Sequence, residues 1–240
     1  MAEILKLEDV SKSFGSLLVT NHLTVSLREG EALGVIGPNG AGKTTMFNLI
    51  GGDLRPSSGR MLFDGADVTS LSPDERCRRG IGRTYQIPHP FAGMTVFENV
   101  LVGATFGRGL GEKATYAEAY EILDRTGLLP KANELAGRLP LLGRKRLELA
   151  RALATKPKIL LLDEIAGGLT VHEVHELIET VKFIHRSGVS IIWIEHVVHA
   201  LLAVVDRLVA LSFGKLLIEG EPKAVMASDE VRDVYMGVDV

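Results

Sequence analysis

The chain has 240 residues, of which 46% are hydrophobic and 24% charged, a composition typical of a globular protein with a sizeable core. Its net charge of −3 gives no electrostatic basis for a nucleic-acid partner. The single cysteine, Cys77, excludes an internal disulfide framework and suits a reducing compartment. Charged residues interrupt the apolar run over residues 197–213, so we expect the protein to reach a membrane only through a partner.

The first part of the chain favours short strands. Alternating apolar and polar residues over 4–8 and 23–27 predict two antiparallel strands, and residues 60–63 predict a further strand. Ser72 and Glu75 form a capping box that predicts a helix start. The arginines of that helix, Arg76, Arg78 and Arg79, are expected on its solvated face. Residues 81–85 then predict a strand that ends at Gln86.

One glycine-rich stretch, the phosphate loop, carries the strongest functional signal. It consists of Gly37, Pro38, Asn39, Gly40, Ala41, Gly42, Lys43, Thr44 and Thr45, and it fits the pattern G-x-x-x-x-G-K-[ST]. A buried strand is predicted before it and a helix after it, which is the setting that this motif requires. Its main-chain N–H groups would surround phosphate oxygens, Lys43 would reach the β- and γ-phosphates, and the Thr44 hydroxyl would bind Mg²⁺.

The middle of the chain, residues 88–150, is predicted to be mostly helical. Thr95 with Glu98, and Thr115 with Glu118, fit the capping-box pattern and predict two helix starts. A break is expected over residues 107–111, and a third helix over residues 143–155.

Strands and helices alternate in the last third. Residues 158–162 form an apolar run typical of a strand inside a parallel sheet, and Asp163 and Glu164 follow it directly. Ligands gather at the carboxyl ends of such strands, so Asp163 is expected to bind Mg²⁺ and Glu164 to orient or deprotonate the attacking water. A helix is predicted from Thr170 to about residue 188, then strands over 189–194, 207–211 and 215–218, and a last helix over 228–236.

Two further polar residues follow predicted strands. Gln86 precedes a proline-containing run, and its amide could contact Mg²⁺ or water. His196 follows an apolar strand and could contact the γ-phosphate, although a helix-capping or core histidine is the alternative.

In this order, these residues resemble the nucleotide-binding subunit of an ABC transporter over essentially the whole chain. Within that family, residues 82–99 and 206–214 resemble the branched-chain amino acid importer subgroup. The resemblance implies one domain over residues 1–240, with an α/β P-loop ATPase fold. It implies a mostly parallel core sheet, a small antiparallel β subdomain and a helical subdomain at about residues 88–150.

The resemblance also implies roles for single residues. Phe14 would stack on the adenine of ATP, and Gln86 would be the Q-loop residue that contacts Mg²⁺. Asp163 and Glu164 would be the Walker B pair, and His196 would be the switch histidine. Gln86, Glu164 and His196 are therefore the predicted catalytic residues, and Thr44, Gln86 and Asp163 the predicted Mg²⁺ ligands.

The implied partners follow from the same family. Two ATPase subunits, identical or different, would close head-to-tail around two ATP molecules. Transmembrane permease subunits would hold them at the cytoplasmic face of the cell membrane, and a periplasmic binding protein would act indirectly. The implied function is ATP hydrolysis that energises import of branched-chain or related amino acids. The alternatives are an exporter ATPase for envelope lipids, a non-transport ABC ATPase, or a regulatory module that binds ATP without hydrolysing it.

The sequence departs from the family pattern in three places. Residues 139–143, here the signature segment, read Leu-Pro-Leu-Leu-Gly where the family has Leu-Ser-Gly-Gly-Gln. Ile165 replaces the usual Pro, and Thr170 replaces an acidic or amide residue. Pro140 has neither a hydroxyl nor an N–H to offer a phosphate. We therefore expect this chain to complete the weaker of two ATP sites, beside a non-identical ATPase with an intact signature.

Overall fold

The chain folds around a mostly parallel sheet, which the computed structural model describes within residues 2–109 and 111–236. Its strand order is β10-β9-β3-β8-β7-β6. The strands are β3 (Ala32–Ile36), β6 (Ile81–Arg83), β7 (Ile159–Asp163), β8 (Ser190–Ile194), β9 (Arg207–Ser212) and β10 (Lys215–Gly220). The central strands β3, β7 and β8 are buried along their whole length, as continuous apolar runs in a parallel sheet predict. β10 pairs antiparallel with β9 at one edge.

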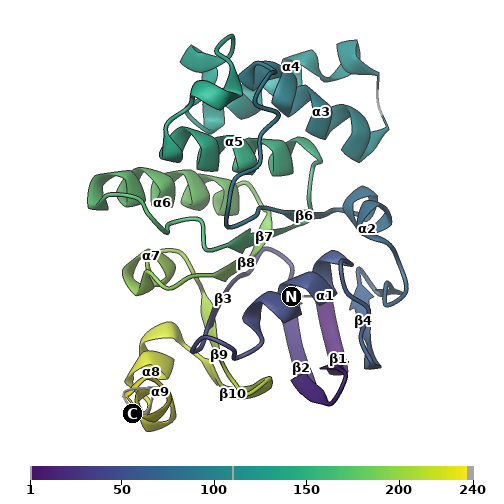
Figure 1. Ribbon diagram of the computed structural model, residues 1–240, viewed down its shortest axis with the longest axis vertical. Helices are drawn as coiled ribbons and strands as arrows, with labels where there is room; N and C mark the ends of the chain where they lie inside the picture. Colours follow the sequence, from purple (N-terminus) through teal and green to yellow (C-terminus); the bar gives the residue numbers. More distant parts are fainter. Residues whose placement is uncertain (1, 110, 237–240) are drawn as a thin grey trace.

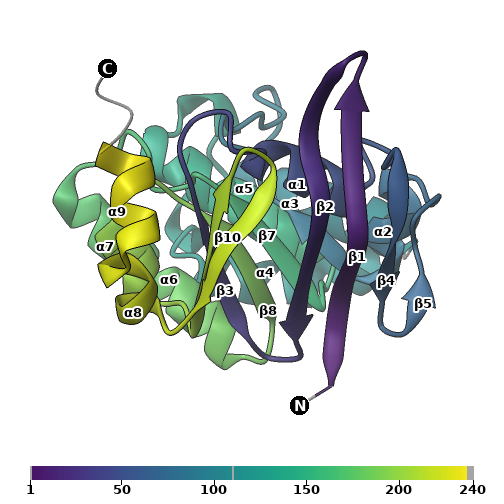
Figure 2. The same ribbon diagram turned by 90° about the horizontal axis from the view of Figure 1, so that it is seen from below.

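A second sheet, with the order β2-β1-β4-β5, is antiparallel and lies beside the first (Figure 2). Its strands are β1 (Glu3–Phe14), β2 (Leu17–Arg28), β4 (Ser58–Phe63) and β5 (Ala66–Asp67). The alternation over residues 4–8 and 23–27 thus correctly predicted an antiparallel pair. Gly15, at φ +59°, lies in the turn between the two long strands.

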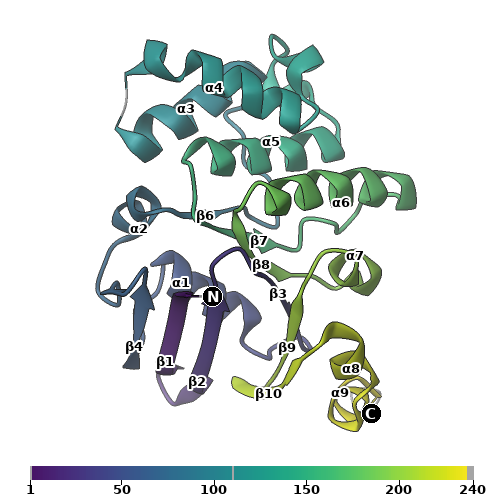
Figure 3. The same cartoon turned by 180° about the vertical axis from the view of Figure 1, so that it is seen from behind.

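Helices cover both sides of the parallel sheet (Figure 3). They are α1 (Lys43–Gly51) on one side, and α6 (Val171–Arg186) and α7 (Val198–Leu202) on the other. Apolar residues of α1 pack with the antiparallel sheet in one core cluster, while those of α6 and α7 form a second. Trp193 is fully buried in the second cluster, as predicted. The helices α2 (Pro73–Arg79), α8 (Pro222–Ala227) and α9 (Asp229–Met236) lie at the periphery.

A helical unit extends from one end of the core (Figure 1). It contains α3 (Val96–Arg108), α4 (Glu112–Arg125) and α5 (Leu141–Ala154), with the short 3₁₀ turns η1 (Leu129–Lys131) and η2 (Ala136–Arg138). Its apolar residues form a third core cluster that includes Val100, Leu123 and Leu147. The helices of this unit therefore pack against one another around a core of their own, and α5 also contacts β6 of the parallel sheet.

One predicted helix start is wrong. Thr95 and Glu98 do form a capping box at α3, but Thr115 and Glu118 lie inside α4, which begins at Glu112. Thr115 is fully buried, so its side chain belongs to the inner face of the helix. Glu118 instead makes ion pairs with Arg108 and Lys156, which satisfies the carboxylate without a helix cap. The predicted break at residues 107–111 begins too early, because α3 continues to Arg108 and only Gly109 and Gly111 are described between α3 and α4, with Leu110 outside the described residues.

The expectation of a solvated arginine face on α2 is also wrong for Arg76. This side chain is 1% exposed, and its guanidinium donates to the carbonyls of Leu49, Ile50 and Thr69. The first two carbonyls belong to the last turn of α1, where intrahelical partners run out. Arg76 thus provides hydrogen bonds to the free carbonyl groups at the end of α1, the helix that follows the phosphate loop.

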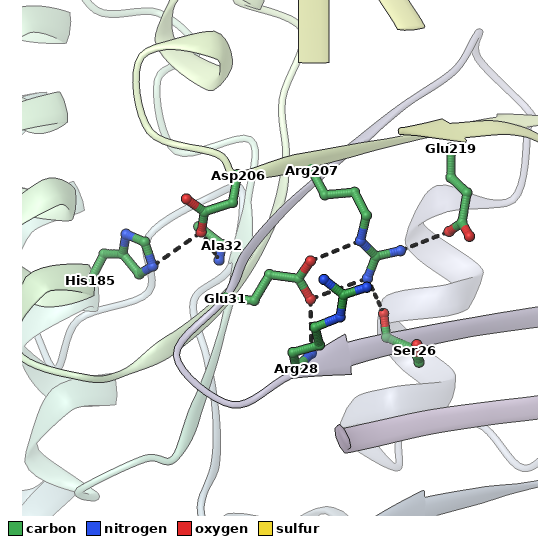
Figure 4. Close-up of polar contacts among 8 residues, drawn as sticks. All are labelled: Ser26, Arg28, Glu31, Ala32, His185, Asp206, Arg207 and Glu219. Carbon is green, nitrogen blue, oxygen red and sulfur yellow. Dashed lines mark hydrogen bonds and ion pairs between the residues drawn. The ribbon is translucent and has the colours of Figure 1, made fainter. Parts of the chain in front are cut away.

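A polar network ties the amino ends of the core strands to β2 (Figure 4). Arg207 donates from two nitrogens to the buried Glu31 carboxylate, at 2.8 and 3.1 Å, and from a third to Glu219. Burial opposes ionisation of Glu31, but hydrogen bonds from Arg207 and from the main-chain N–H of Arg28 outweigh it and lower its pKa. The Asp206 carboxylate accepts the N–H of Ala32 at 2.8 Å, which joins β9 to the start of β3.

We predict that Arg207→Met lowers the free energy of unfolding by about 3–5 kcal/mol, because it leaves the buried Glu31 carboxylate without its cation. Chemical denaturation followed by circular dichroism measures this loss. The double variant Arg207→Met/Glu31→Gln removes the orphaned charge and should recover part of the stability. Equal losses in the single and double variants would contradict a stabilising ion pair.

Candidate functional site

The phosphate loop connects β3 to α1 and lies against β2. Gly40 and Gly42 have φ of +80° and +95°, angles that side-chain-bearing residues rarely adopt. A Cβ at position 42 would lie 2.8 Å from the carbonyl oxygen of Val19, so glycine is also required by space. The glycines therefore allow the loop to turn tightly and to touch the antiparallel sheet.

Lys43, the first residue of α1, is buried beside this loop. Its Nζ donates to the carbonyl oxygens of Gly37 at 2.6 Å and Pro38 at 3.0 Å. Burial lowers the pKa of Lys43, while the negative charges of Glu164 and Asp163 oppose that shift. A buried ammonium at the start of a helix, where main-chain N–H groups also point outward, forms a site for an anion.

A pocket of about 170 Å³ opens over the loop. It is lined by Val19, Asn39, Gly40, Ala41, Gly42, Lys43, Thr44, Thr45 and Glu164. The predicted base, Glu164, therefore faces the predicted phosphate-binding residues across the pocket. Phe14 lies at the end of β1, half exposed and outside this lining, and its role in adenine stacking stays a prediction.

The turn between β9 and β10 also contacts the loop. Gly214 donates its N–H to the carbonyl of Ala41 at 3.1 Å and accepts the N–H of Asn21 at 2.8 Å. A Cβ at position 214 would lie 2.2 Å from the carbonyl oxygen of Val19. Phe213, the other turn residue, has φ of +47° and is 89% exposed. Three distant parts of the sequence thus meet through their main chains at the phosphate loop.

Asp163 ends β7 and is buried next to Arg83, which ends the neighbouring strand β6. Arg83 Nη2 lies 3.1 Å from the Asp163 carboxylate, and Nη1 donates to Asn48 at 2.7 Å and Asp53 at 2.8 Å. Burial raises the pKa of Asp163, and the hydrogen bond from Arg83 opposes that shift. Sequence reasoning missed Arg83 as a site residue, although its position at the end of the strand adjacent to β7 was a usable signal.

The three predicted catalytic residues lie together. The Gln86 amide donates to one oxygen of Glu164 at 2.5 Å, and His196 Nε2 lies 2.9 Å from the other. Glu164 has φ of +47°, a conformation that is uncommon for residues other than glycine and often marks a functional site. This arrangement orients a carboxylate toward the pocket, where it could accept a proton from water.

The oxygen atoms at the site suit Mg²⁺. Thr44 contributes a hydroxyl, Asp163 a carboxylate and Gln86 an amide, all hard donors of the kind that this ion prefers. Within the described residues, no group of three or more His, Cys, Asp or Glu could hold a metal by itself. That is compatible with Mg²⁺, which at nucleotide sites usually takes few protein ligands along with phosphates and water.

Two buried charges near Glu164 also escaped sequence reasoning. Lys145, on α5, donates from Nζ to the main-chain carbonyl of Glu164 at 3.3 Å. Glu195, which follows β8, accepts the N–H of Ala166 at 2.9 Å. Burial raises the pKa of Glu195 to about 7 and lowers that of Lys145. The sequence shows Glu195 next to His196 at the end of a predicted strand, but it does not show that the Glu195 side chain is buried.

The signature segment leads into α5, which begins at Leu141 after Pro140 at the N-cap. No side chain caps this helix start. Leu139 and Leu142 are buried, whereas Leu141 is 42% exposed. The exposed end of α5 thus presents an apolar side chain where the family pattern has glycine.

Comparison with known families agrees with this site. The ABC transporter family profile matches residues 20–167, which include the phosphate loop, Gln86 and the pair Asp163 and Glu164. The chain belongs to the ABC transporter family. It is 34% identical to the high-affinity branched-chain amino acid transport ATP-binding protein LivG of Escherichia coli, with 98% of each chain covered. It is 32% identical to the lipopolysaccharide export system ATP-binding protein LptB of Haemophilus influenzae, covering 98% of this chain and 97% of that protein.

Solved structures agree with the fold. The crystal structure of the ADP conformation of MJ1267, an ATP-binding cassette of an ABC transporter, matches with a TM-score of 0.91 and 31% identity, over 99% of this chain and 100% of that chain. A dimeric post-hydrolysis structure of the ATP-binding cassette MJ0796, bound to ADP and Pi, matches with a TM-score of 0.81 and 26% identity, over 91% and 98%.

The expected family, fold and enzyme class are therefore confirmed. The protein is an ABC ATPase of a transporter, and proteins of this family bind ATP and hydrolyse it. Across residues 2–109 and 111–236, no helix has both the length and the apolar character needed to cross a membrane.

Because the pKa of Glu195 is raised, the difference in stability between wild type and Glu195→Gln depends on pH. Between its usual value of 4.5 and about 7, the unfolded chain loses this proton while the folded chain keeps it, so wild-type stability falls as pH rises. Glu195→Gln removes this contribution. Its stability relative to wild type should rise by roughly 3 kcal/mol between pH 4.5 and pH 8, measured by chemical denaturation. A difference that does not change with pH would contradict the shift.

Proposed function

We propose that this chain is the ATP-hydrolysing subunit of an importer for branched-chain or related amino acids. Its identity to LivG proteins, 33% for that of Archaeoglobus fulgidus over 98% of this chain and 96% of that protein, carries the proposal. The second candidate is an exporter of envelope lipid, which the comparable identity to LptB favours. Transport of leucine and of envelope lipid distinguishes the two candidates.

The geometry supports a role for each residue in ATP hydrolysis. The phosphate loop and Lys43 would bind the phosphates, and Glu164 would accept a proton from the attacking water. Gln86 and His196, which hydrogen-bond the two oxygens of Glu164, would fix the direction of its carboxylate. Thr44, Asp163 and Gln86 would hold Mg²⁺, which supplies positive charge to the phosphates when it is bound.

A groove beside the site offers a docking place for the permease. It has a volume of about 320 Å³ and lies between α2, α3 and α5, with Arg83, Tyr85 and Arg151 in its lining. The exposed side chains of Ile87 and Phe91 follow in the same segment as Gln86. Permease subunits bound in this groove would hold the ATPase at the cytoplasmic face of the membrane, and a periplasmic binding protein would deliver the cargo to them.

The signature segment supports an unequal pair of ATP sites. In a head-to-tail dimer, each ATP lies between one subunit's phosphate loop and the other subunit's signature. Pro140 lacks a hydroxyl and an N–H, and the Leu141 side chain hinders the close approach that glycine permits. We infer that this chain pairs with a non-identical ATPase, whose intact signature completes the site that contains Lys43, Asp163 and Glu164.

Lys43→Ala should weaken ATP binding by about ten- to a hundredfold, because it removes charge-assisted hydrogen bonds to the phosphates. Adenosine, which has no phosphate, should bind as it does to wild type. Titration calorimetry with both ligands measures the difference. Equal losses for ATP and adenosine would reject the assigned role of Lys43.

Glu164→Gln should keep ATP binding and lower hydrolysis by roughly 10²–10⁴-fold, since glutamine retains the shape but loses the basicity. In cells whose own copy is replaced by this variant, uptake of labelled leucine should cease. Undiminished leucine uptake with hydrolysis abolished would reject amino acid import. Loss of envelope lipid transport in the same cells would support the LptB-like alternative.

The proposed inequality of the two ATP sites predicts different results for the isolated chain and for the assembled transporter. Purified alone, this chain should bind ATP but hydrolyse it slowly, and in the assembled transporter Glu164→Gln should stop transport more completely than the matching change in the partner. Brisk hydrolysis by the isolated chain would show that the signature segment is functional and that no second ATPase is needed.

A further inference from the structure

The turn that follows Glu164 has two hydrogen bonds of its own, from the N–H of Gly167 to the carbonyl of Glu164 at 3.4 Å and from the N–H of Leu169 to the carbonyl of Ala166 at 3.3 Å. Glu164 itself has φ of +47°, and Gly168, which ends the turn, has φ of +78°. The residues between them are Ile165, Ala166 and Gly167, whose side chains carry no hydrogen-bonding groups. Contacts from other elements add to the two local hydrogen bonds in holding the Glu164 carboxylate.

One such contact comes from α5. Lys145 is 5% exposed, and its Nζ donates to the main-chain carbonyl of Glu164 at 3.3 Å. Lys145 lies one helical turn after Leu141, the exposed residue at the start of the same helix. The ammonium thus connects the signature segment, through a rigid helix, to the peptide group of the predicted base.

A second contact comes from the end of β8. Glu195 is 2% exposed and accepts the N–H of Ala166 at 2.9 Å. The preceding residue, Ile194, accepts the N–H of Glu164 at 2.9 Å. The turn is therefore bonded to β8 at both Glu164 and Ala166, and to α5 at the carbonyl of Glu164.

Burying the side chains of Lys145 and Glu195 costs free energy, and neither side chain has an assigned role in ATP hydrolysis. A buried charge is strongly unfavourable unless it is paired or hydrogen-bonded. Lys145 and Glu195 each favour the charged form of the other, although burial has the larger effect on both. Neither belongs to the groups assigned to phosphate, Mg²⁺ or water, so their shared target, the turn at Glu164, is the contact that accounts for them.

We propose that Lys145 and Glu195 are positioning residues that clamp the turn after β7 and hold the Glu164 carboxylate in its working orientation, an inference that rests on the proposed role of Glu164 as base. The clamp fixes the carbonyl of Glu164 and the N–H of Ala166, so the strained φ of Glu164 is kept. Its side chain then reaches Gln86 and His196. A shift of the signature segment would also reach Glu164 through Lys145.

Three variants test the clamp. Glu195→Leu removes the acceptor for Ala166, Lys145→Met removes the donor to Glu164, and Glu195→Gln keeps an acceptor oxygen. Hydrolysis of radiolabelled ATP by the assembled transporter, in which the partner ATPase completes the site of this chain, should slow about ten- to a hundredfold in the first two, because a misplaced catalytic group costs rate. Calorimetric ADP affinity should stay within about twofold of wild type, and Glu195→Gln should restore a rate within about threefold.

Two controls separate the clamp from a general loss of stability and from a direct effect of Glu195 on ATP. Arg207→Met lowers stability at the opposite ends of the core strands and should leave the hydrolysis rate unchanged. Adding Glu195→Leu to Glu164→Gln should cause no further loss, because the clamp acts through Glu164. A further loss in that background, a wild-type rate for Glu195→Leu, or equal rates for the Leu and Gln variants would overturn the proposal. Wild-type hydrolysis by Glu164→Gln alone would instead reject the base.

Discussion

Parallel pairing of β3, β8, β7 and β6 places the carboxyl ends of these strands along one edge of the sheet. The phosphate loop leaves β3 there, Asp163 and Glu164 leave β7, and Glu195 and His196 leave β8. Each segment carries polar groups that need partners once the strand ends, and the neighbouring segments provide them. The candidate ATP site is thus a consequence of strand order, which brings loops of different chemistry to a common edge.

Buried charge distinguishes this edge from the rest of the core. Lys43, Lys145, Asp163 and Glu195 are all nearly inaccessible to water, and burial shifts the pKa of each toward its neutral form. At the amino ends of the strands, by contrast, Glu31 and Arg207 satisfy each other directly, and the pKa of Glu31 is lowered. The two edges therefore serve different purposes. One edge holds the sheets together. At the other, Lys43 and Asp163 lie beside the phosphate loop, and Lys145 and Glu195 hydrogen-bond the turn at Glu164.

Much of the fold was predictable because it depends on local patterns. The apolar run before Asp163, the glycines of the phosphate loop and the capping boxes at Ser72, Thr95 and Thr170 all specify structure through nearby residues. The meeting of Gln86, Glu164 and His196 was predictable for a different reason, since their order matched a family. Arg83, Lys145 and Glu195 were missed because their importance lies in the direction of a long side chain, which only tertiary packing decides. Arg76 was misjudged for the same reason, because the carbonyls it satisfies at Leu49 and Ile50 belong to a separate helix far earlier in the chain.

The turn between β9 and β10 has a consequence for how this protein can be modified. Because Phe213 is largely exposed at the tip of a hairpin, the turn resembles a place where a tag, a fluorophore or an inserted peptide would be harmless. Its neighbour Gly214, however, is bonded through its main chain to Ala41 of the phosphate loop and to Asn21 of β2. A residue inserted there would displace the main chain of Gly214, which is bonded to the phosphate loop. Exposure of a side chain is therefore a poor guide to tolerance at this hairpin, because the constraint lies in the backbone beneath it.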